Sequence, residues 1–251
     1  MAMTSEIEPA QRSARRVLAL LDASRHSLAA LRAAVELATL RQEELVALFV
    51  EDMDLLHSAG FPFALEVGGH SGLTRPLSPE QVESSLGRQR ERVTHALAEA
   101  VKGRQIHHSL RVSRGRIVTE ALSLAAPGDL VVLGKASSAG HYGGVRLGST
   151  CRALILQAPC MVLIWDERRP LNHGPLRVLS DHVPEGLLGL PLCDRVEQLP
   201  AQNAASLERT LADARSGALL LHRAELDRLC GQDPDLLARI PVPIIVVPDP
   251  S

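Results

Sequence analysis

The stretch from Gly134 to Ser149 has the composition of an anion-binding loop. It contains five glycines, follows the apolar run Asp129–Leu133 and precedes a segment with helical character, Thr150–Leu156. The first amides of a helix have no intrahelical partners and carry partial positive charge, so a glycine-rich loop placed there can hold a phosphate group. The sequence therefore predicts an anion site between this strand and this helix.

Three residues inside the loop bear on how it would hold an anion. Lys135 is one of only two lysines in a chain with 25 arginines, and its ammonium group could lie near a phosphate. The alternative for Lys135 is a solvated loop charge. Gly140 keeps the loop pliable, whereas Ser137 brings a Cβ atom that obstructs a close backbone approach.

The loop belongs to a chain in which strands and helices alternate. Arg16–Leu21 is a continuous apolar run typical of a strand buried on both faces, and Ser24 is a suitable N-cap for the helix that follows. This alternation predicts an α/β fold, an open five-stranded parallel sheet with helices on both faces. Because ligands bind beyond the carboxyl ends of such strands, we expect Asp22 and Gly134 on opposite sides of one crevice.

The expected strands are 16–21, 44–50, 105–112, 129–133 and 160–165, and the expected helices are 24–40, 79–101, 115–126 and 148–157. Between the second strand and the second helix, Glu51–Ser78 is a long connection without clear periodicity. Connections of this length are usually lids, partner-binding loops or disordered insertions, and the sequence leaves all three open.

Several short motifs follow one another in a family-specific order. They are Asp-x-Ser after the first strand (Asp22, Ser24), an acid pair after the second, Gly115 before the third helix, Leu-Val-Val-Leu-Gly ending at Gly134, the pair Gly148-Ser149, and Ala-Pro-Cys-x-Val-Leu-Ile ending at Ile164. On these residues the segment 16–166 resembles a universal stress protein domain. We expect that domain at 16–168, after a flexible N-terminal tail at 1–15.

The resemblance implies a site for an adenine nucleotide, ATP or AMP, with or without magnesium. Carried over position by position, it places Asp22 against the adenosine, Val50 in the base pocket, Leu133 and Gly134 beside the nucleotide, and Gly148, Ser149 and Thr150 at the phosphates. This chain departs from the nucleotide-binding pattern in three ways. Ser137 stands where the middle glycine belongs, the interval from Gly134 to Gly148 is one residue longer, and Leu21 replaces a small hydroxyl residue found in some members.

The remaining residues indicate a shortened, degenerate copy of the same α/β fold at 176–251, after a linker at 169–175. The segments Leu176–Asp181, Ala218–Arg223 and Pro241–Val247 parallel the first, fourth and fifth strands. His222-Arg223 replaces the Leu-Gly pair that starts the loop, so we expect no nucleotide in this half. An apolar edge strand needs covering, and Ile244–Val247 is expected to cover Met161–Trp165 and form an intramolecular pseudo-dimer. An unrelated small α/β lobe is the alternative, and further homodimerisation stays open.

Composition excludes several classes of protein. The formal charge of −2, with both signs interspersed, argues against nucleic-acid and anionic-membrane partners, and no apolar run approaches the length of a membrane span. Residues 1–15 lack the apolar core of a signal peptide, so a cytoplasmic location is expected. Four cysteines and ten histidines show no metal-ligand spacing, and we predict no tightly bound metal.

Two functions from different classes remain open. The first is a cytosolic stress-response or regulatory protein that binds an adenine nucleotide in its N-terminal domain. The second, favoured by Ser137, the longer loop and Leu21, is a related interaction module that binds no nucleotide and regulates an unidentified protein partner. An enzyme ranks third, because the loop offers only His141 for hydrolysis, with Asp22 on the other side. No catalytic residues are predicted, and activity would be at most slow ATP hydrolysis.

Overall fold

The computed structural model describes residues 15–68, 71–135, 137–139, 145–166, 173–179, 183, 194–200 and 203–249. Within these ranges one sheet of nine strands runs through the molecule, in the order β11-β10-β12-β13-β9-β6-β1-β2-β5. None of the helices described is both long and apolar enough to cross a membrane. Of the predicted tail at 1–15, residues 1–14 lie outside the described ranges.

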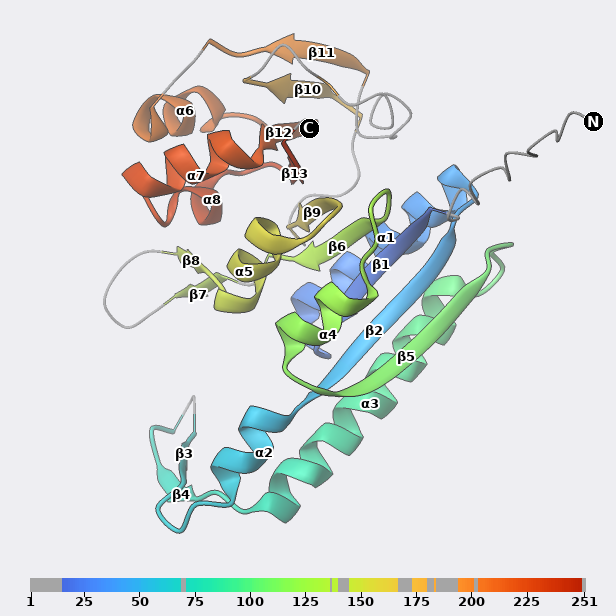
Figure 1. Cartoon of the computed structure of the whole chain (residues 1–251), viewed down its shortest axis with the longest axis vertical. Helices are drawn as coiled ribbons and strands as arrows, with labels where there is room; N and C mark the ends of the chain where they lie inside the picture. The colour runs from blue at the N-terminus through green and yellow to red at the C-terminus, as the bar shows by residue number, and fades with distance from the viewer. Residues whose placement is uncertain are drawn as a thin grey trace, which may run out of the picture.

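The N-terminal half confirms the expected parallel α/β architecture. Its five strands are all parallel, namely β1 (Arg16–Leu21), β2 (Glu44–Asp52), β5 (His108–Gly115), β6 (Leu130–Gly134) and β9 (Met161–Trp165). Its helices are α1 (Arg25–Arg41), α2 (Met53–Ala59), α3 (Pro79–Val101), α4 (Ile117–Leu124) and α5 (Ser149–Gln157). Helices α1 and α3 pack on one face of these strands, and α4 and α5 pack on the other (Figure 1).

Strand β1 lies in the middle of this half, between β2 and β6. Ala19 pairs in register with Ala47 on one side and Val132 on the other. Its side chains alternate between the two cores, Val17 and Ala19 toward α1 and Leu18 toward α5. A strand buried on both faces needs an unbroken apolar sequence, which is why the run that ends at Leu21 was recognisable. The polar residue that follows it, Asp22, is thereby fixed at the carboxyl edge of the sheet.

The C-terminal half continues the same sheet. Its elements are β10 (Pro175–Val178), β11 (Arg195–Gln198), α6 (Ala204–Leu211), β12 (Ala218–His222), α7 (Arg223–Gln232), α8 (Leu236–Arg239) and β13 (Ile244–Val247). Strand β13 pairs antiparallel with β9, with Ile245 opposite Leu163, so the predicted covering of Met161–Trp165 by Ile244–Val247 is confirmed (Figure 1). Most of the predicted linker, and residues 180 and 181 of the predicted strand, lie outside the described part of the chain.

Three local features differ from the sequence expectations. The connection 51–78 is not a plain loop, because it contains α2 and a hairpin of β3 (Leu65–Val67) and β4 (Thr74–Pro76). The glycine-rich loop also contains a hairpin, β7 (Ser137–Ala139) with β8 (Val145–Leu147). Short strands of three residues carry too little pattern to be recognised. The strand expected at 105–112 begins three residues later, at His108.

Candidate functional site

A cavity of about 260 Å³ lies at the carboxyl ends of β1 and β6. It brings together seven of the ten predicted site residues: Asp22, Val50, Leu133, Gly134, Gly148, Ser149 and Thr150. Four apolar side chains besides Val50 and Leu133 contribute to its wall, namely Leu20, Leu21, Ile117 and Cys151. The cavity wall therefore combines apolar side chains with polar groups, as expected for a small-molecule site at the edge of an open parallel sheet.

Asp22 supplies an anionic group to this cavity. Ser24 N–H donates to its carboxylate at 2.9 Å, and the backbone N–H of Asp22 donates to the Ser27 hydroxyl at 3.3 Å. Partial enclosure raises the pKa of Asp22, but hydrogen bonds from Ser27, Ser24 and the backbone outweigh that effect and leave its pKa below the ordinary value. The Asp22 side chain is therefore a carboxylate at neutral pH, able to accept hydrogen bonds from hydroxyl or amino groups.

The turn after β1 is tightly constrained. Ala23 has a φ of 61°, a left-handed conformation that is uncommon for a residue with a side chain. Ser24 then caps α1, accepting a hydrogen bond from Ser27 N–H at 3.2 Å. The first turn of α1 is thus held against the cavity, and it contributes His26 and Ser27 to the wall.

Gly134 has a steric reason to be glycine. A Cβ atom at this position would lie 2.5 Å from the backbone carbonyl of His26 and 2.8 Å from Ser27 N. These are backbone atoms of α1, so they cannot move aside as the end of a side chain would. At Gly134, β6 therefore packs directly on the backbone of α1, and Gly134 is part of the cavity wall.

The N-terminus of α5 supplies the opposite, electropositive end. Gly148 is its N-cap, and the Gly148 carbonyl accepts the first helical bond, from Arg152 N–H at 3.1 Å. The amides of Ser149, Thr150 and Cys151 precede that bond and have no intrahelical acceptor. The first turn contains no acidic residue, and a Cβ at Gly148 would have no atom of the described residues within 4 Å.

Cys151 adds no charge to this end of the cavity. Burial raises the pKa of its thiol to about 12, although Lys135 acts in the opposite direction. The neutral thiol neither repels an anion nor reacts as a thiolate. Among the described residues of the cavity wall, Asp22 is the one acidic side chain.

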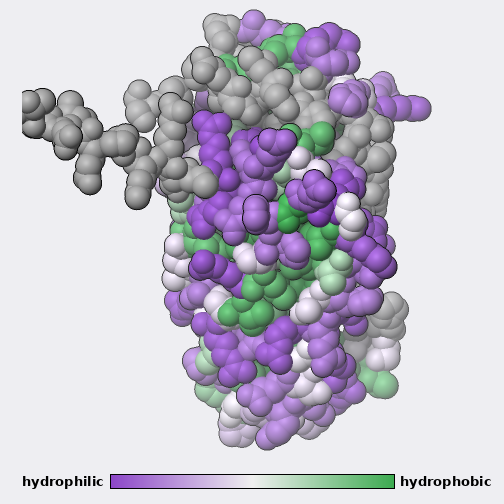
Figure 2. Space-filling model, turned by 90° about the vertical axis from the view of Figure 1, so that its right-hand side faces the viewer, coloured by the Kyte–Doolittle hydropathy of each residue, from purple (hydrophilic) through white to green (hydrophobic). Residues whose placement is uncertain are grey.

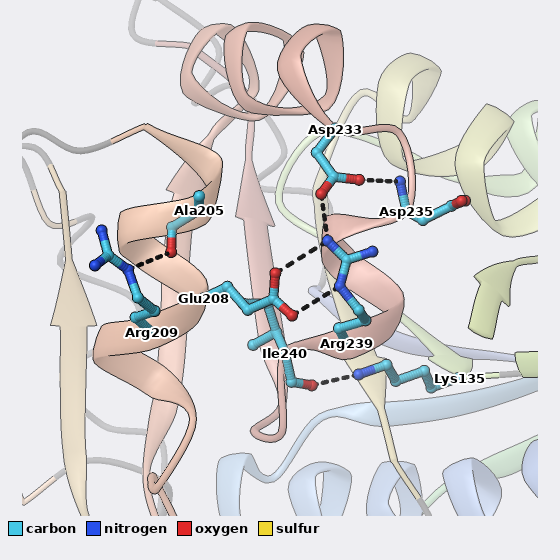
Figure 3. A network of polar contacts seen from close by, with 8 residues as sticks. All are labelled: Lys135, Ala205, Glu208, Arg209, Asp233, Asp235, Arg239 and Ile240. Carbon is cyan, nitrogen blue, oxygen red and sulfur yellow. Dashed lines mark hydrogen bonds and ion pairs between the residues drawn. The ribbon is translucent and has the colours of Figure 1, made fainter. Parts of the chain in front are cut away.

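The expectation that the Lys135 ammonium lies near the phosphates is corrected. Lys135 is not among the residues of the cavity wall, and its side chain is buried with 4% exposed. Its Nζ atom donates to the carbonyl oxygen of Ile240, which follows α8 (Figure 3). A buried ammonium needs acceptors, and the C-terminal end of a helix supplies carbonyl groups without helical partners. Figure 3 shows the same segment anchored by Arg239, which contacts Glu208 and Asp233.

Two predicted site residues cannot be placed in the cavity. Ser137 lies in β7 with its backbone in register with Leu147, but its side chain is outside the described part of the structure. Gly140 lies outside the described residues altogether. The part played by these two residues therefore stays a prediction.

Seven residues of the cavity wall were not among the predicted site residues: Leu20, Leu21, Ser24, His26, Ser27, Ile117 and Cys151. His26 and Ser27 follow the recognised cap Ser24. They could have been found from their position, because they lie in the first turn of a helix that begins at the carboxyl edge of the sheet. Ile117 begins α4 and Cys151 lies in the first turn of α5, so the same rule applies. Among the residues described, no three histidine, cysteine or acidic side chains come together as a metal site.

The second half is built differently at the equivalent position. Strand β12 ends at His222 and α7 begins at Arg223, without a loop between them. His222 N–H donates instead to the Glu225 carboxylate at 3.0 Å. In the first turn of α7, Ala224 N–H donates to the Asp249 carboxylate at 2.9 Å, so this helix start carries an acidic partner that the start of α5 does not have among the described residues.

Fold and cavity together define an open parallel α/β domain with a ligand-sized site at its carboxyl edge. The model of the universal stress protein family matches residues 13–165, more than half of the chain, and the protein belongs to that family. No curated protein shows a significant match.

Three solved structures illustrate what this chain is similar to. A universal stress protein from Archaeoglobus fulgidus superposes with a TM-score of 0.61 at 13% identity, covering 94% of this chain and 99% of that chain. UspA from Lactobacillus plantarum gives a TM-score of 0.42 at 21% identity, covering 60% and 96%. A universal stress protein in complex with cAMP gives 0.35 at 20% identity, covering 61% and 97%. Of these three, the first supports the fold along nearly the whole chain.

Proposed function

We propose that this protein is a cytoplasmic stress-response or regulatory protein that binds an adenine nucleotide in its N-terminal half. The observation that carries the proposal is that one cavity contains both the Asp22 carboxylate and the first-turn amides of α5, which have no acceptor within the helix. A nucleotide has matching ends, with hydroxyl and amino donors on the nucleoside and negative charge on the phosphates. Family membership is consistent with this reading.

The charges orient the ligand in the proposed complex. A carboxylate repels phosphate, so Asp22 receives ribose hydroxyls or the adenine amino group, and the base lies along Val50, Ile117 and Leu133. The phosphate then lies at Gly148, Ser149 and Thr150, where amides and helix dipole favour an anion. The cavity of about 260 Å³ is just below the roughly 300–1,000 Å³ typical of ligand pockets, which favours AMP over ATP.

Isothermal titration of the full chain with AMP, ATP and GMP, each with and without Mg²⁺, tests this proposal. AMP is expected to bind with micromolar affinity and to raise the melting temperature, since a ligand at 100 times its Kd stabilises the fold by about 2.7 kcal/mol. GMP is the matched control, because it carries the same ribose and phosphate with a different base. The proposal fails if neither adenine nucleotide binds or shifts the melting curve.

A second candidate function, an interaction module, is favoured by one specific surface. We name the segment from α2 to β4 the α2–β4 arm, residues 53–76. Phe61 and Phe63 are 54% and 78% exposed and stack on each other with ring centroids 5.5 Å apart. Three further exposed apolar residues follow them, namely Leu65, Val67 and Leu73. Apolar side chains gathered in this way are typical of a protein-binding surface.

The arm hypothesis is tested with Phe63→Ser, using affinity capture followed by identification of the bound proteins. A partner that uses the arm binds the unaltered chain and is lost from the variant, while both chains keep the same melting temperature because the ring is exposed. A partner retained equally by both would assign the interaction to another surface.

We further infer that the C-terminal half is a shortened copy of the N-terminal half, with the boundary at the predicted linker 169–175. The order β11-β10-β12-β13 repeats the order β2-β1-β6-β9 along the sheet, and within the described residues no strand corresponds to β5. The antiparallel junction of β9 and β13 would then lie on the axis of a pseudo-dimer. Expression of residues 1–168 alone tests this: with β9 uncovered, it is expected to self-associate in analytical ultracentrifugation, whereas a monomer would contradict the inference.

A further inference from the structure

Strand β5 ends the sheet at the edge opposite to the C-terminal half. Its eight residues pair with β2 along their whole length, and within the described ranges no strand pairs with its outer side. A long free edge presents a row of unused backbone donors and acceptors to other chains. The β5 edge is therefore a candidate binding surface, separate from the cavity at β1 and β6.

The hydrogen-bond register identifies the peptide groups that point outward. Leu45 N–H donates to the carbonyl of His107 at 2.9 Å, so the peptide groups of His107 point toward β2. Peptide groups alternate along a strand, so every second residue after His107 also points toward β2. The outward peptide groups are those of the residues in between, namely His108, Leu110, Val112 and Arg114.

The two faces of this edge differ in character. Val112 is in register with Phe49, which belongs to the core beneath α1 and α3, and Val112 itself is 42% exposed. Arg111 is in register with Leu48, which belongs to the core beneath α4 and α5. Figure 2, viewed from the β5 side of Figure 1, shows hydrophobic residues gathered at mid-height within a hydrophilic surround. An occupant must therefore cover an apolar side chain on one face and meet a cation on the other.

The face toward α4 carries one cation and one carboxylate, Arg111 and Glu120. Both line a depression of about 440 Å³, and neither side chain forms an ion pair with another described residue. A Cβ atom at Gly115 would lie 2.6 Å from the Glu120 carboxylate, so this carboxylate lies over the end of β5, beyond Arg111 along the strand. A partner that carries charge of one sign is attracted by one of these two groups and repelled by the other.

A second copy of this chain satisfies both charges at once. A twofold axis brings the cation of each copy to the carboxylate of the other, so the patch is complementary to itself, as an isologous interface requires. Arg114, the other arginine of the strand, already pairs with Glu51 in its own chain. The far end of the sheet offers a poorer match, because β11 has four residues and its Glu197 already pairs with Arg177.

We propose that β5 pairs antiparallel with β5 of a second copy, with Val112 on the twofold axis, so that one sheet runs through a homodimer. The outward peptide groups of Val112 exchange hydrogen bonds with those of Val112 in the second copy, and those of Leu110 do so with Arg114. The exposed Val112 side chains of the two copies then cover each other.

The charges select this register. Placing Arg111 on the axis would set like charges directly opposite each other, which is destabilising. With Val112 on the axis, Arg111 lies opposite Ser113 of the second copy, and its guanidinium reaches the Glu120 carboxylate over the neighbouring Gly115. Two such ion pairs form, one on each side of the axis.

The dimer surface is independent of the other sites described. Neither β5 nor Glu120 contributes to the cavity at β1 and β6, so the proposal does not rest on nucleotide binding. In the full chain β9 is covered by β13, so that edge is not free to associate. Self-association of the full chain can therefore be assigned to β5 with variants of β5 and α4.

Sedimentation velocity of the full chain tests the charge pattern. Because an interface of one strand per copy is small, the protein is measured up to about 100 µM, where the unaltered chain is expected to be a dimer. Arg111→Glu and Glu120→Arg are each expected to weaken dimerisation at least tenfold, since each sets like charges together on both sides of the axis. Arg32→Glu, the same change at an exposed arginine of α1, is the matched control and should leave the dimer intact.

An equimolar mixture of the two variants is the decisive sample. One chain then carries two carboxylates at the interface and the other two cations, so a heterodimer is expected where neither variant dimerises alone. A monomeric unaltered chain overturns the proposal, as do single variants that dimerise like the unaltered chain, or folded variants whose mixture stays monomeric. Head-to-tail polymers in place of a dimer would overturn it as well.

A disulfide cross-link tests the register without depending on the charge variants. In Val112→Cys the two Cα atoms face each other across the axis at about 5.5 Å, within the range that a disulfide spans. Oxidation is expected to give a covalent dimer on a non-reducing gel. In the control Leu110→Cys the two positions are four residues out of register, about 14 Å apart along the strands, and no cross-link is expected. Cross-linking of both variants, or of neither, overturns the proposal.

Discussion

The Nζ atom of Lys135 donates a hydrogen bond to the carbonyl oxygen of Ile240, joining the end of β6 to the end of α8. Gly134, which precedes the lysine, is part of the cavity wall, and Ile240 belongs to the C-terminal half. The side chain therefore connects the two halves next to the proposed nucleotide site. Because the Lys135 side chain is not part of the cavity wall, its contribution to the free energy of unfolding can be measured separately from ligand binding.

Replacing Lys135 by methionine is expected to lower the free energy of unfolding by about 1–3 kcal/mol, because the Ile240 carbonyl loses a buried donor. Urea denaturation followed by circular dichroism measures this change. The affinity for AMP is expected to stay within about twofold, since the Lys135 side chain is not part of the cavity wall.

Lys102→Met is the matched control, because Lys102 is the only other lysine and its side chain is 76% exposed. Its variant should unfold at the same urea concentration as the unaltered chain. If Lys135→Met lowers AMP affinity tenfold or more without loss of stability, the lysine acts on the phosphate and the structural role is wrong.

Long apolar runs and helix caps carried the sequence prediction of the fold. Arg16–Leu21 and Asp129–Leu133 gave strands within one residue, and Ser24 accepts the cap hydrogen bond expected of it. The parallel order placed Asp22 and Gly134 at one edge, and the structure brings both into one cavity. These features depend on local sequence and on rules of chain connection, which a single sequence contains.

Side-chain direction could not be predicted in the same way. Whether Lys135 points toward the cavity or away from it depends on Ile240, 105 positions further along the chain. The Phe61–Phe63 stack and the hairpin β3–β4 involve segments too short for a periodic signal. Gly134 was recognised as a glycine of the loop, but its contact with the backbone of His26 needed the packing of α1 to become visible.

Gly134→Ala is expected to lower the stability of the fold, whereas Gly148→Ala is expected to leave it unchanged. A methyl group at position 134 would meet the His26 backbone at 2.5 Å, and overpacking of this kind costs about 1–3 kcal/mol or more. A methyl group at position 148 meets no atom of the described residues within 4 Å, so that variant should keep its melting temperature. Differential scanning calorimetry of both compares them directly, and equal melting temperatures would contradict the packing of β6 on α1.

The stability of the protein is expected to depend on Asp22 in acid. Its folded-state pKa lies below the unfolded value of about 3.9. Its contribution is therefore complete above pH 4 and is lost as the pH falls through the folded-state pKa. Urea unfolding of the unaltered chain and of Asp22→Asn, from pH 6 down to pH 2, should give curves that lie apart near neutrality and converge in acid. A constant difference over that range would mean that the carboxylate is not favoured by the fold.

A negative charge in the first turn of α5 is expected to block the phosphate end of the cavity while leaving the fold intact. Thr150 lies in that turn and lines the cavity, and the turn contains no acidic residue. Thr150→Glu should weaken AMP binding at least tenfold by repulsion, although an acidic residue near a helix N-terminus stabilises the helix by about 0.3–1 kcal/mol. Thr150→Gln has nearly the same size without the charge, and its affinity for AMP should fall far less.

Adenosine, which has no phosphate, should bind the unaltered chain and Thr150→Glu equally well. Isothermal titration with AMP and adenosine distinguishes the outcomes: equal losses for both ligands would mean that the side chain obstructs the site, and undiminished AMP binding would place the phosphate away from α5.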